Sequence, residues 1–176
     1  MKKVSIIGLS FLSVLTVATV LFFQSCNTDE CKDVVCLNGG ACVAGACVCD
    51  AGYDGTDCDH QIREDYLRVG ATATENCVGF DPPDYTVDIV EGTGNDEFRI
   101  KNLGNYACAI GDYYVVCTVS TSTDFTISNQ TVCSGGLTFT GSGDIDSNGN
   151  VTVNYTATYD PGTGTVTDDC TVIISP

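Results

Sequence analysis

The sequence contains little positive charge. It has seven Lys and Arg against 23 Asp and Glu, and two of the seven, Lys2 and Lys3, stand at the N-terminus. A protein that binds nucleic acid needs a stripe of cations to neutralise phosphates, and five scattered cations do not supply one. Anionic lipid and anionic polysaccharide would be repelled for the same reason. We therefore expect no nucleic-acid partner.

Groups suited to catalysis are also scarce. His60 is the only histidine, and no Gly-x-Ser-x-Gly sequence is present. A nucleophile needs an adjacent base, which a single histidine in this context does not provide. Two carboxylates could serve a glycosidase, but with 23 acids some pair must lie close whatever the function. We expect no enzymatic activity and interpret His60 as a solvated residue.

The N-terminus has the pattern of an export signal. Lys2 and Lys3 precede an uncharged apolar run that ends in Phe23-Gln24-Ser25-Cys26. This ending resembles a bacterial lipoprotein signal, and the resemblance implies a signal peptide over residues 1–25 and lipidation of Cys26. Two alternatives remain: an uncleaved anchor, because about 20 apolar residues can just span a bilayer, and a signal removed elsewhere. All three place the rest of the chain outside the cytoplasm.

The cysteine content agrees with export. Twelve cysteines in a chain of this size form a disulfide inventory that only an oxidising compartment maintains. Residues 26–30 are interpreted as a polar tether, in which Asp29-Glu30 resembles the acidic stretch that directs some bacterial lipoproteins to the cell exterior. We expect a lipid-anchored protein at the outer membrane or cell surface.

Residues 31–58 contain six cysteines in the spacing C-x4-C-x5-C-x4-C-x-C-x8-C, with Asn38-Gly39-Gly40 between the second and third and a Gly-Tyr-x-Gly-x-x-Cys ending. The segment resembles an EGF-like domain. That resemblance implies bonds between Cys31 and Cys42, Cys36 and Cys47, and Cys49 and Cys58, whereas spacing alone allows 15 connectivities. So short a segment cannot bury enough apolar surface to offset chain entropy, and cross-links worth about 2–4 kcal/mol each replace a core. Zinc is excluded because the segment has no Cys-x-x-Cys pair or histidine.

After a linker predicted over residues 59–64, the chain from 65 to 176 alternates between short apolar-polar runs and turns rich in Gly, Asn and Asp. The pattern predicts an all-β fold, an eight-stranded antiparallel meander closed into a barrel, with an immunoglobulin-like β-sandwich as the alternative. Strands are predicted near 66–75, 85–90, 97–102, 113–120, 125–129, 137–144, 151–159 and 165–174.

Five further cysteines lie in this region, so at least one thiol is free or intermolecular. We predict a bond between Cys77 and Cys170, because the first and last strands are neighbours in a closed meander, and a second bond between Cys117 and Cys133. The order of Phe98-Arg99-Ile100, Phe125-Thr126-Ile127 and a last-strand cysteine resembles the lipocalin-like domain of EGF-containing bacterial surface lipoproteins. This resemblance implies no assigned activity.

Two segments resemble calcium sites in part. Residues 27–31 carry acids before the first cysteine, as in calcium-binding EGF-like modules, but the companion Asn or Asp with an aromatic is missing. Residues 144–150 match the start of an EF-hand loop, but the twelfth position is Tyr155 instead of Glu. A hairpin turn is the favoured interpretation of this second segment. We expect no metal or cofactor, with calcium as a minor alternative.

The favoured function is adhesion or protein binding by the β-domain, through loop aromatics such as Tyr106, Tyr113 and Tyr114. A carrier of a small apolar ligand is the alternative, and it requires an interior cavity of about 300 Å³ or more. An enzyme or enzyme inhibitor is the third possibility. The sequence leaves open the partner, the pairing of Cys108, Cys117 and Cys133, the oligomeric state and the face of the membrane.

Overall fold

The computed structural model of the chain describes residues 30–176. The predicted signal peptide, Cys26 and the tether up to residue 29 therefore lie outside the described residues. Within the described range, the regular elements are twelve strands and three short 3-10 helices. No helix in this part of the chain is both long and apolar enough to cross a membrane.

Residues 31–61, here called the N-terminal unit, are held together by disulfides. The unit contains two small sheets, one formed by β1 (Ala41–Val43) with β2 (Ala46–Val48) and one by β3 (Tyr53–Asp54) with β4 (His60–Gln61). Its bonds join Cys31 to Cys42, Cys36 to Cys47 and Cys49 to Cys58, the pairs that the resemblance implies. Many of its apolar side chains are exposed: Val35, Leu37, Val43 and Val48. Cross-links, rather than a core, therefore hold this segment.

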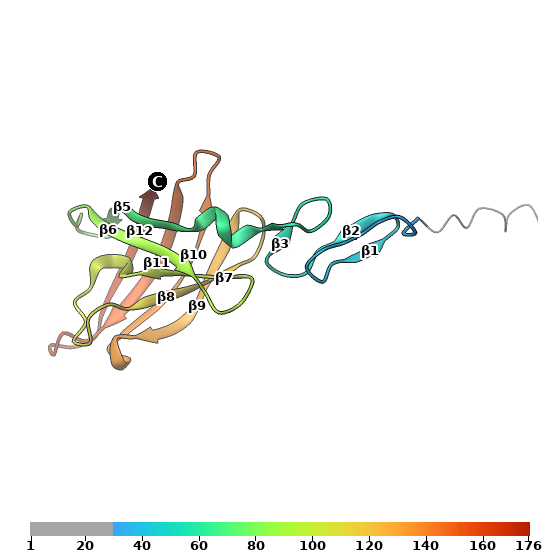
Figure 1. Cartoon of the computed structure of the whole chain (residues 1–176). Coiled ribbons are helices and arrows are strands. Elements are labelled where there is room, and N and C mark those ends of the chain that lie inside the picture. The colour runs from blue at the N-terminus through green and yellow to red at the C-terminus, as the bar shows by residue number, and fades with distance from the viewer. Residues whose placement is uncertain (1–29) are drawn as a thin grey trace, which may run out of the picture.

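Eight antiparallel strands close into a barrel in the order β10-β11-β12-β5-β6-β7-β8-β9 (Figure 1). Their bounds are β5 (Arg68–Cys77), β6 (Tyr85–Glu91), β7 (Glu97–Lys101), β8 (Tyr114–Val119), β9 (Asp124–Val132), β10 (Leu137–Ile145), β11 (Val151–Tyr159) and β12 (Val166–Ser175). The 3-10 helices are η1 (Ile62–Tyr66), η2 (Leu103–Asn105) and η3 (Cys133–Gly135). The predicted all-β meander barrel is confirmed, and the immunoglobulin-like sandwich is excluded because the sheet is closed.

The barrel closes where its first and last strands pair. Residues Cys77 of β5 and Cys170 of β12 face each other in the antiparallel register and form a disulfide, with 4.0 Å between their Cα atoms. Both side chains are buried. Closure removes the free edges that an open sheet would expose, and the bond fixes this seam covalently.

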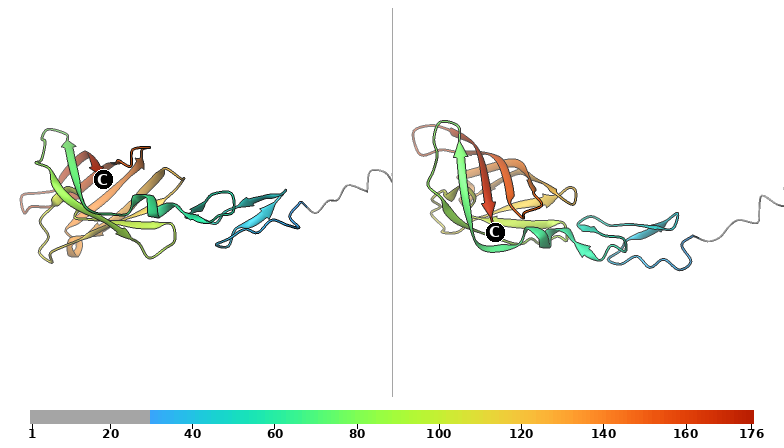
Figure 2. Two further views of the ribbon diagram at one scale, coloured as in Figure 1. Left: turned by 45° about the horizontal axis from the view of Figure 1, so that its top comes forward. Right: turned by 90° about the horizontal axis from the view of Figure 1, so that it is seen from above.

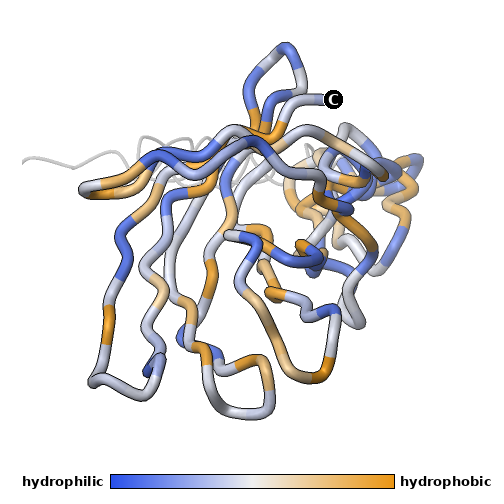
Figure 3. Tube along the Cα trace, turned by 90° about the vertical axis from the view of Figure 1, so that its left-hand side faces the viewer, coloured by the Kyte–Doolittle hydropathy of each residue, from blue (hydrophilic) through white to orange (hydrophobic). Residues whose placement is uncertain are grey.

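Side chains fill the barrel interior. Hydrophobic and hydrophilic residues alternate along the strands (Figure 3), so one face of each strand points inward. At the end next to the N-terminal unit, the Tyr66 ring stacks on Phe98 at 4.5 Å between centroids, and Phe125 packs edge-on against Phe98 at 5.0 Å. Gly143 makes room for this cluster, because a Cβ there would lie 2.3 Å from the Phe125 ring.

The predicted bond between Cys117 and Cys133 is wrong. Cys133 is bonded to Cys108, and Cys117 is a free, buried cysteine whose thiol has a pKa raised by burial. In the pairing of β8 with β9, Thr118 faces Thr126, so Cys117 lies near the middle of β9. Cys133 lies six residues farther along, about 20 Å at the rise of a strand, and a disulfide needs Cα atoms within about 7 Å.

The segment predicted as a linker, residues 59–64, is regular structure. His60 and Gln61 form β4, and residues from Ile62 form η1, whose Ile62 and Tyr66 are buried. Tyr66 therefore ends a helix inside the barrel mouth, and the first barrel strand begins at Arg68 instead of Tyr66. Both views in Figure 2 show the N-terminal unit projecting from one side of the barrel.

Candidate functional site

The candidate site is the barrel end opposite the N-terminal unit, here called the distal end. Because the strands form an antiparallel meander, alternate connections lie at the same end. Four connections meet there, residues 78–84, 102–113, 133–136 and 160–165. The Cys108–Cys133 bond joins two of them, with 5.3 Å between Cα atoms. The sequence predicted neither the Cys108–Cys133 bond nor the proximity of these four loops.

A pocket of about 380 Å³ opens between these loops. Its lining consists of Tyr106, Ala107, Cys108, Ala109, Cys133, Gly136, Leu137, Tyr159, Asp160 and Pro161. The rings of Tyr106 and Tyr159 lie 5.3 Å apart, and the Tyr106 hydroxyl donates a hydrogen bond to Asp168 at 2.8 Å. Ile110, in the same loop as Tyr106, is exposed. The pocket therefore offers aromatic and aliphatic contacts beside carboxylates.

A buried polar network supports the pocket from inside the barrel. Glu75 points inward from β5, and the Tyr155 hydroxyl donates a hydrogen bond to its carboxylate. Burial raises the pKa of Glu75, although hydrogen bonds from Tyr155 and Tyr85 oppose the shift. The Tyr85 hydroxyl also accepts a hydrogen bond from the Gly104 amide at 2.8 Å. The network thereby connects the barrel interior to the loop of residues 102–113.

The three aromatics proposed for binding from sequence have different environments. Tyr113 is buried, and its hydroxyl donates to the Leu103 carbonyl and accepts from the Tyr106 amide at 3.1 Å. Tyr114 is exposed, with the Arg99 guanidinium 5.0 Å from the ring centroid. Of the three, Tyr106 lines the pocket. Tyr113 instead holds the loop in place, because alternation along the strand that follows turns it inward.

A second hollow, of about 480 Å³, lies on the outer face of β10, β11, β12 and β5. Its side chains are largely hydrogen-bonded to each other across the strands. The Thr156 hydroxyl donates to Asp169 at 2.7 Å, and the Thr171 hydroxyl donates to Asn154 at 2.8 Å. These pairs bind neighbouring strands together, and the hollow is a shallow polar surface of the sheet.

The candidate metal ligands are engaged in other interactions. Glu75, Cys77 and Cys170 offer ligand atoms within 4.8 Å of one another, but the two sulfurs form a disulfide and provide no thiolate. Asp146 of the EF-hand-like segment accepts hydrogen bonds from the amides of Asn148 and Asn150, both at 2.8 Å. These bonds form the turn between β10 and β11, as the hairpin interpretation predicts. The other calcium candidate lies mostly outside the described residues.

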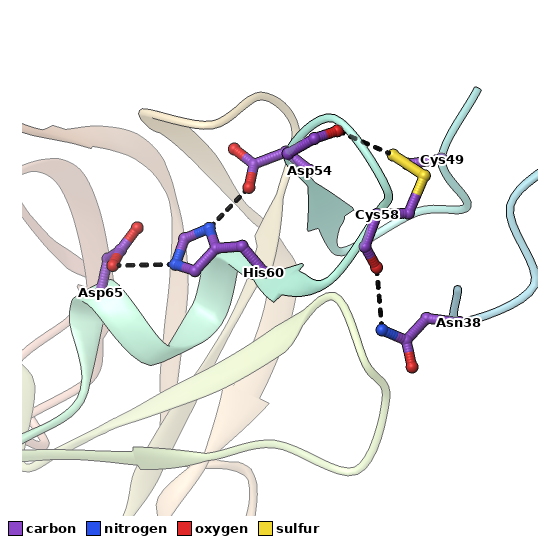
Figure 4. Close-up of polar contacts among 7 residues, drawn as sticks. Asn38, Cys49, Asp54, Cys58, His60 and Asp65 are labelled. Carbon is purple, nitrogen blue, oxygen red and sulfur yellow. Dashed lines mark hydrogen bonds and ion pairs between the residues drawn. A yellow bond between two sulfur atoms is a disulfide. The ribbon is translucent and has the colours of Figure 1, made fainter. Parts of the chain in front are cut away.

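His60 lies at the joint between the N-terminal unit and the barrel (Figure 4). Its Nδ1 is 2.5 Å from Asp54 of β3, and its Nε2 is 3.3 Å from Asp65 of η1. The hydrogen bond with Asp54 raises the pKa of the imidazole. The His60 side chain remains 42% exposed, as expected for a solvated residue, and it also bridges two acids. No pattern in the sequence predicted that His60 would contact both Asp54 and Asp65.

Further contacts at this joint are made with the backbone of the barrel turn between β6 and β7. Gly52 has φ +87°, and a Cβ there would lie 2.6 Å from the Asn95 carbonyl oxygen in the turn between β6 and β7. Arg63 donates to the Gly94 carbonyl of that turn at 2.7 Å, and Gln61 donates to the Asn95 carbonyl at 3.2 Å. The N-terminal unit is thus seated on the barrel turn rather than connected by a free linker.

Comparisons with known proteins give little guidance. No protein-family model matches the chain, and no curated protein matches it. Among solved structures, it is similar to a Bacteroides fragilis chain described as "a putative outer membrane protein", with 19% identity and a TM-score of 0.38. The match covers 65% of this chain and 52% of that one, so the chain spans about half the length of the structure it matches.

Proposed function

We propose that this protein is a lipid-anchored extracytoplasmic binding module. In this proposal Cys26 carries the anchor, the N-terminal unit is an EGF-like spacer, and the distal end of the barrel binds a partner protein. The disulfides support an extracytoplasmic location, because five such bonds persist only where the compartment is oxidising.

The filled barrel interior is the observation that favours a protein partner over a small apolar ligand. Phe98, Phe125 and Phe139 are buried inside it, together with aliphatic side chains from all eight strands. A carrier of a small apolar ligand needs an unfilled interior. The pocket among the distal loops, in contrast, opens outward and lies away from the N-terminal unit. The geometry therefore supports recognition by the loops over enclosure in the barrel.

Charge indicates the chemistry of the partner. Acids stand around the distal end at Asp81, Asp84, Asp112 and Asp160, and the chain as a whole has a formal charge of −16. Lys101, near this end, is held by Asp112 at 2.7 Å. We expect a partner surface that pairs an apolar or aromatic side chain with basic residues, and binding that weakens as salt screens the charges.

A comparison of two surface variants tests this proposal. The protein comprising residues 30–176 would be produced in an oxidising compartment and used to capture proteins from surface-labelled host cells. The captured proteins would be compared between the wild type and the variants Ile110→Asp and Val69→Asp. Both substitutions replace an exposed aliphatic residue by an acid, but Ile110 lies in the distal loops and Val69 in the barrel wall near the other end. We expect Ile110→Asp to lose the captured protein and Val69→Asp to retain it.

Equal retention by the two variants would place recognition outside the distal loops. Recovery of a small apolar molecule with the purified protein, in the absence of a protein partner, would favour the carrier. The anchor has its own test, in which Cys26→Ala should move the protein from the membrane fraction to the soluble extracytoplasmic fraction. Retention of Cys26→Ala in the membrane would argue for an uncleaved anchor instead.

A further inference from the structure

The hairpin of β1 and β2 exposes a face that consists entirely of small apolar residues. The register pairs Ala41 with Val48 and Val43 with Ala46, while Cys42 and Cys47 point to the opposite face and form disulfides. All four residues of the first face are exposed, and Val43 and Val48 have 57% and 58% of their surface accessible. Contiguous exposed apolar surface is a feature of protein–protein and membrane contact sites.

Neighbouring residues extend this apolar surface. Val35 is 70% exposed and lines the same hollow as Ala46. No residue from Val34 to Cys49 is charged, in a chain that is 17% charged. Acids flank the hollow at Asp33 and Asp57. The N-terminal unit thus combines an uncharged apolar hairpin with acidic flanks.

The hairpin also lies where the chain leaves the described structure. A Cβ at Gly45, in the hairpin turn, would lie 3.5 Å from both the Cβ and the carbonyl oxygen of Glu30, the first described residue. Figures 1 and 2 show the hairpin on the side of the N-terminal unit away from the barrel. Cys26 precedes Glu30 by four residues, and four extended residues reach at most about 14 Å. A lipid on Cys26 therefore keeps this hairpin next to the bilayer.

We infer that the apolar face of Ala41, Val43, Ala46 and Val48 rests on the surface of the bilayer that holds the anchor, an inference that depends on the proposed lipidation of Cys26. The occupant is a neutral lipid surface, because the acidic flanks oppose contact with anionic headgroups. Partial burial of valine and alanine among lipid headgroups and upper acyl chains removes apolar area from water. The contact would direct the barrel and its distal loops away from the membrane.

The lack of tryptophan in the chain provides a direct test. The lipidated full chain carrying Val43→Trp or Val48→Trp would be reconstituted in phosphatidylcholine vesicles, with and without brominated phosphatidylcholine as a quencher. Val78→Trp, at a distal position that is 80% exposed, is the matched control. We expect blue-shifted emission and about twofold quenching for the reporters at 43 and 48, and neither effect for the reporter at 78.

The possible failures are distinguishable. If the protein sediments with the vesicles but the three reporters behave alike, the bilayer contact is refuted while the anchor stands. A blue shift at 43 and 48 without quenching would show that protein, such as a second copy of the chain, covers the face, and would also overturn the inference. If the wild type does not sediment with vesicles and its Cys26 peptide carries no lipid, the proposed anchor fails first and the inference fails with it.

Discussion

Removal of the disulfide at the barrel seam should cost more stability than removal of the disulfide between the distal loops. The Cys77–Cys170 bond closes a sequence separation of 93 residues, whereas Cys108–Cys133 closes 25. The loop-closure entropy of the unfolded chain gives about 4.7 kcal/mol for the first bond and about 3.5 kcal/mol for the second at 25 °C. Their difference, about 1.2 kcal/mol, arises from loop length alone.

The assay is urea unfolding of residues 30–176 under non-reducing conditions, with the double variants Cys77→Ala/Cys170→Ala and Cys108→Ala/Cys133→Ala. Double substitution leaves no new thiol in either case. The m value reports whether the surface exposed on unfolding has changed. If the seam variant loses less stability than the loop variant, or less than about 2 kcal/mol, the reasoning from chain entropy fails for this barrel.

Four substitutions test the packing and the titratable groups. Phe98→Ala should lower the free energy of unfolding by about 3–5 kcal/mol, because the ring is fully buried and stacked on Tyr66. Tyr66→Phe should raise it by about 1 kcal/mol, because the buried Tyr66 hydroxyl has no hydrogen-bond partner within the described residues. His60→Gln should be less stable than wild type at pH values below 6.5, the pKa of histidine in the unfolded chain, because Asp54 holds the protonated form of His60. This difference in stability should vanish as the pH rises through the raised pKa of His60 in the folded protein. Glu75→Gln should be more stable than wild type near neutral pH, because burial in the folded protein favours the protonated form of Glu75 over the charged form. This difference in stability should disappear at pH values below 4.5, the pKa of glutamate in the unfolded chain.

Each of these outcomes has a contrary result. A loss below about 1 kcal/mol for Phe98→Ala would mean that the barrel end is loosely packed. A marked loss for Tyr66→Phe would reveal a partner for its hydroxyl. A pH-independent effect of His60→Gln or Glu75→Gln, measured by urea unfolding between about pH 4 and about pH 9, would remove the ionisation argument for that residue.

The local pattern of the sequence predicts the barrel strands well, because alternation reports directly on which side chains face the interior. All eight predicted strands occur, with ends that differ by a few residues. The seam bond followed from topology, since the end strands of a closed meander must pair. The pattern wrongly placed Tyr66 at the start of the first strand, whereas it ends η1. A single buried aromatic residue just before a strand gives the same sequence signal whether it belongs to the strand or to a preceding helix.

The features that sequence could not supply depend on contacts between distant loops. Cys108 lies in a twelve-residue connection, and only the folded barrel brings this loop to Cys133. The contacts of His60 with Asp54 and Asp65 form only when the N-terminal unit packs against η1, and the positions of these residues in the sequence do not predict that packing. The distal pocket likewise has no motif, because its residues come from three separate connections and the strand ends beside them.

Non-reducing peptide mapping by mass spectrometry of the protein isolated from the envelope of its native host tests the proposed export, anchor and disulfide pattern most directly. We expect an N-terminal peptide that begins at lipid-modified Cys26, the five disulfides of the structure, and Cys117 as a reduced thiol. Free thiols throughout residues 31–58, or an unprocessed N-terminus on protein recovered from the cytosol, would contradict this expectation.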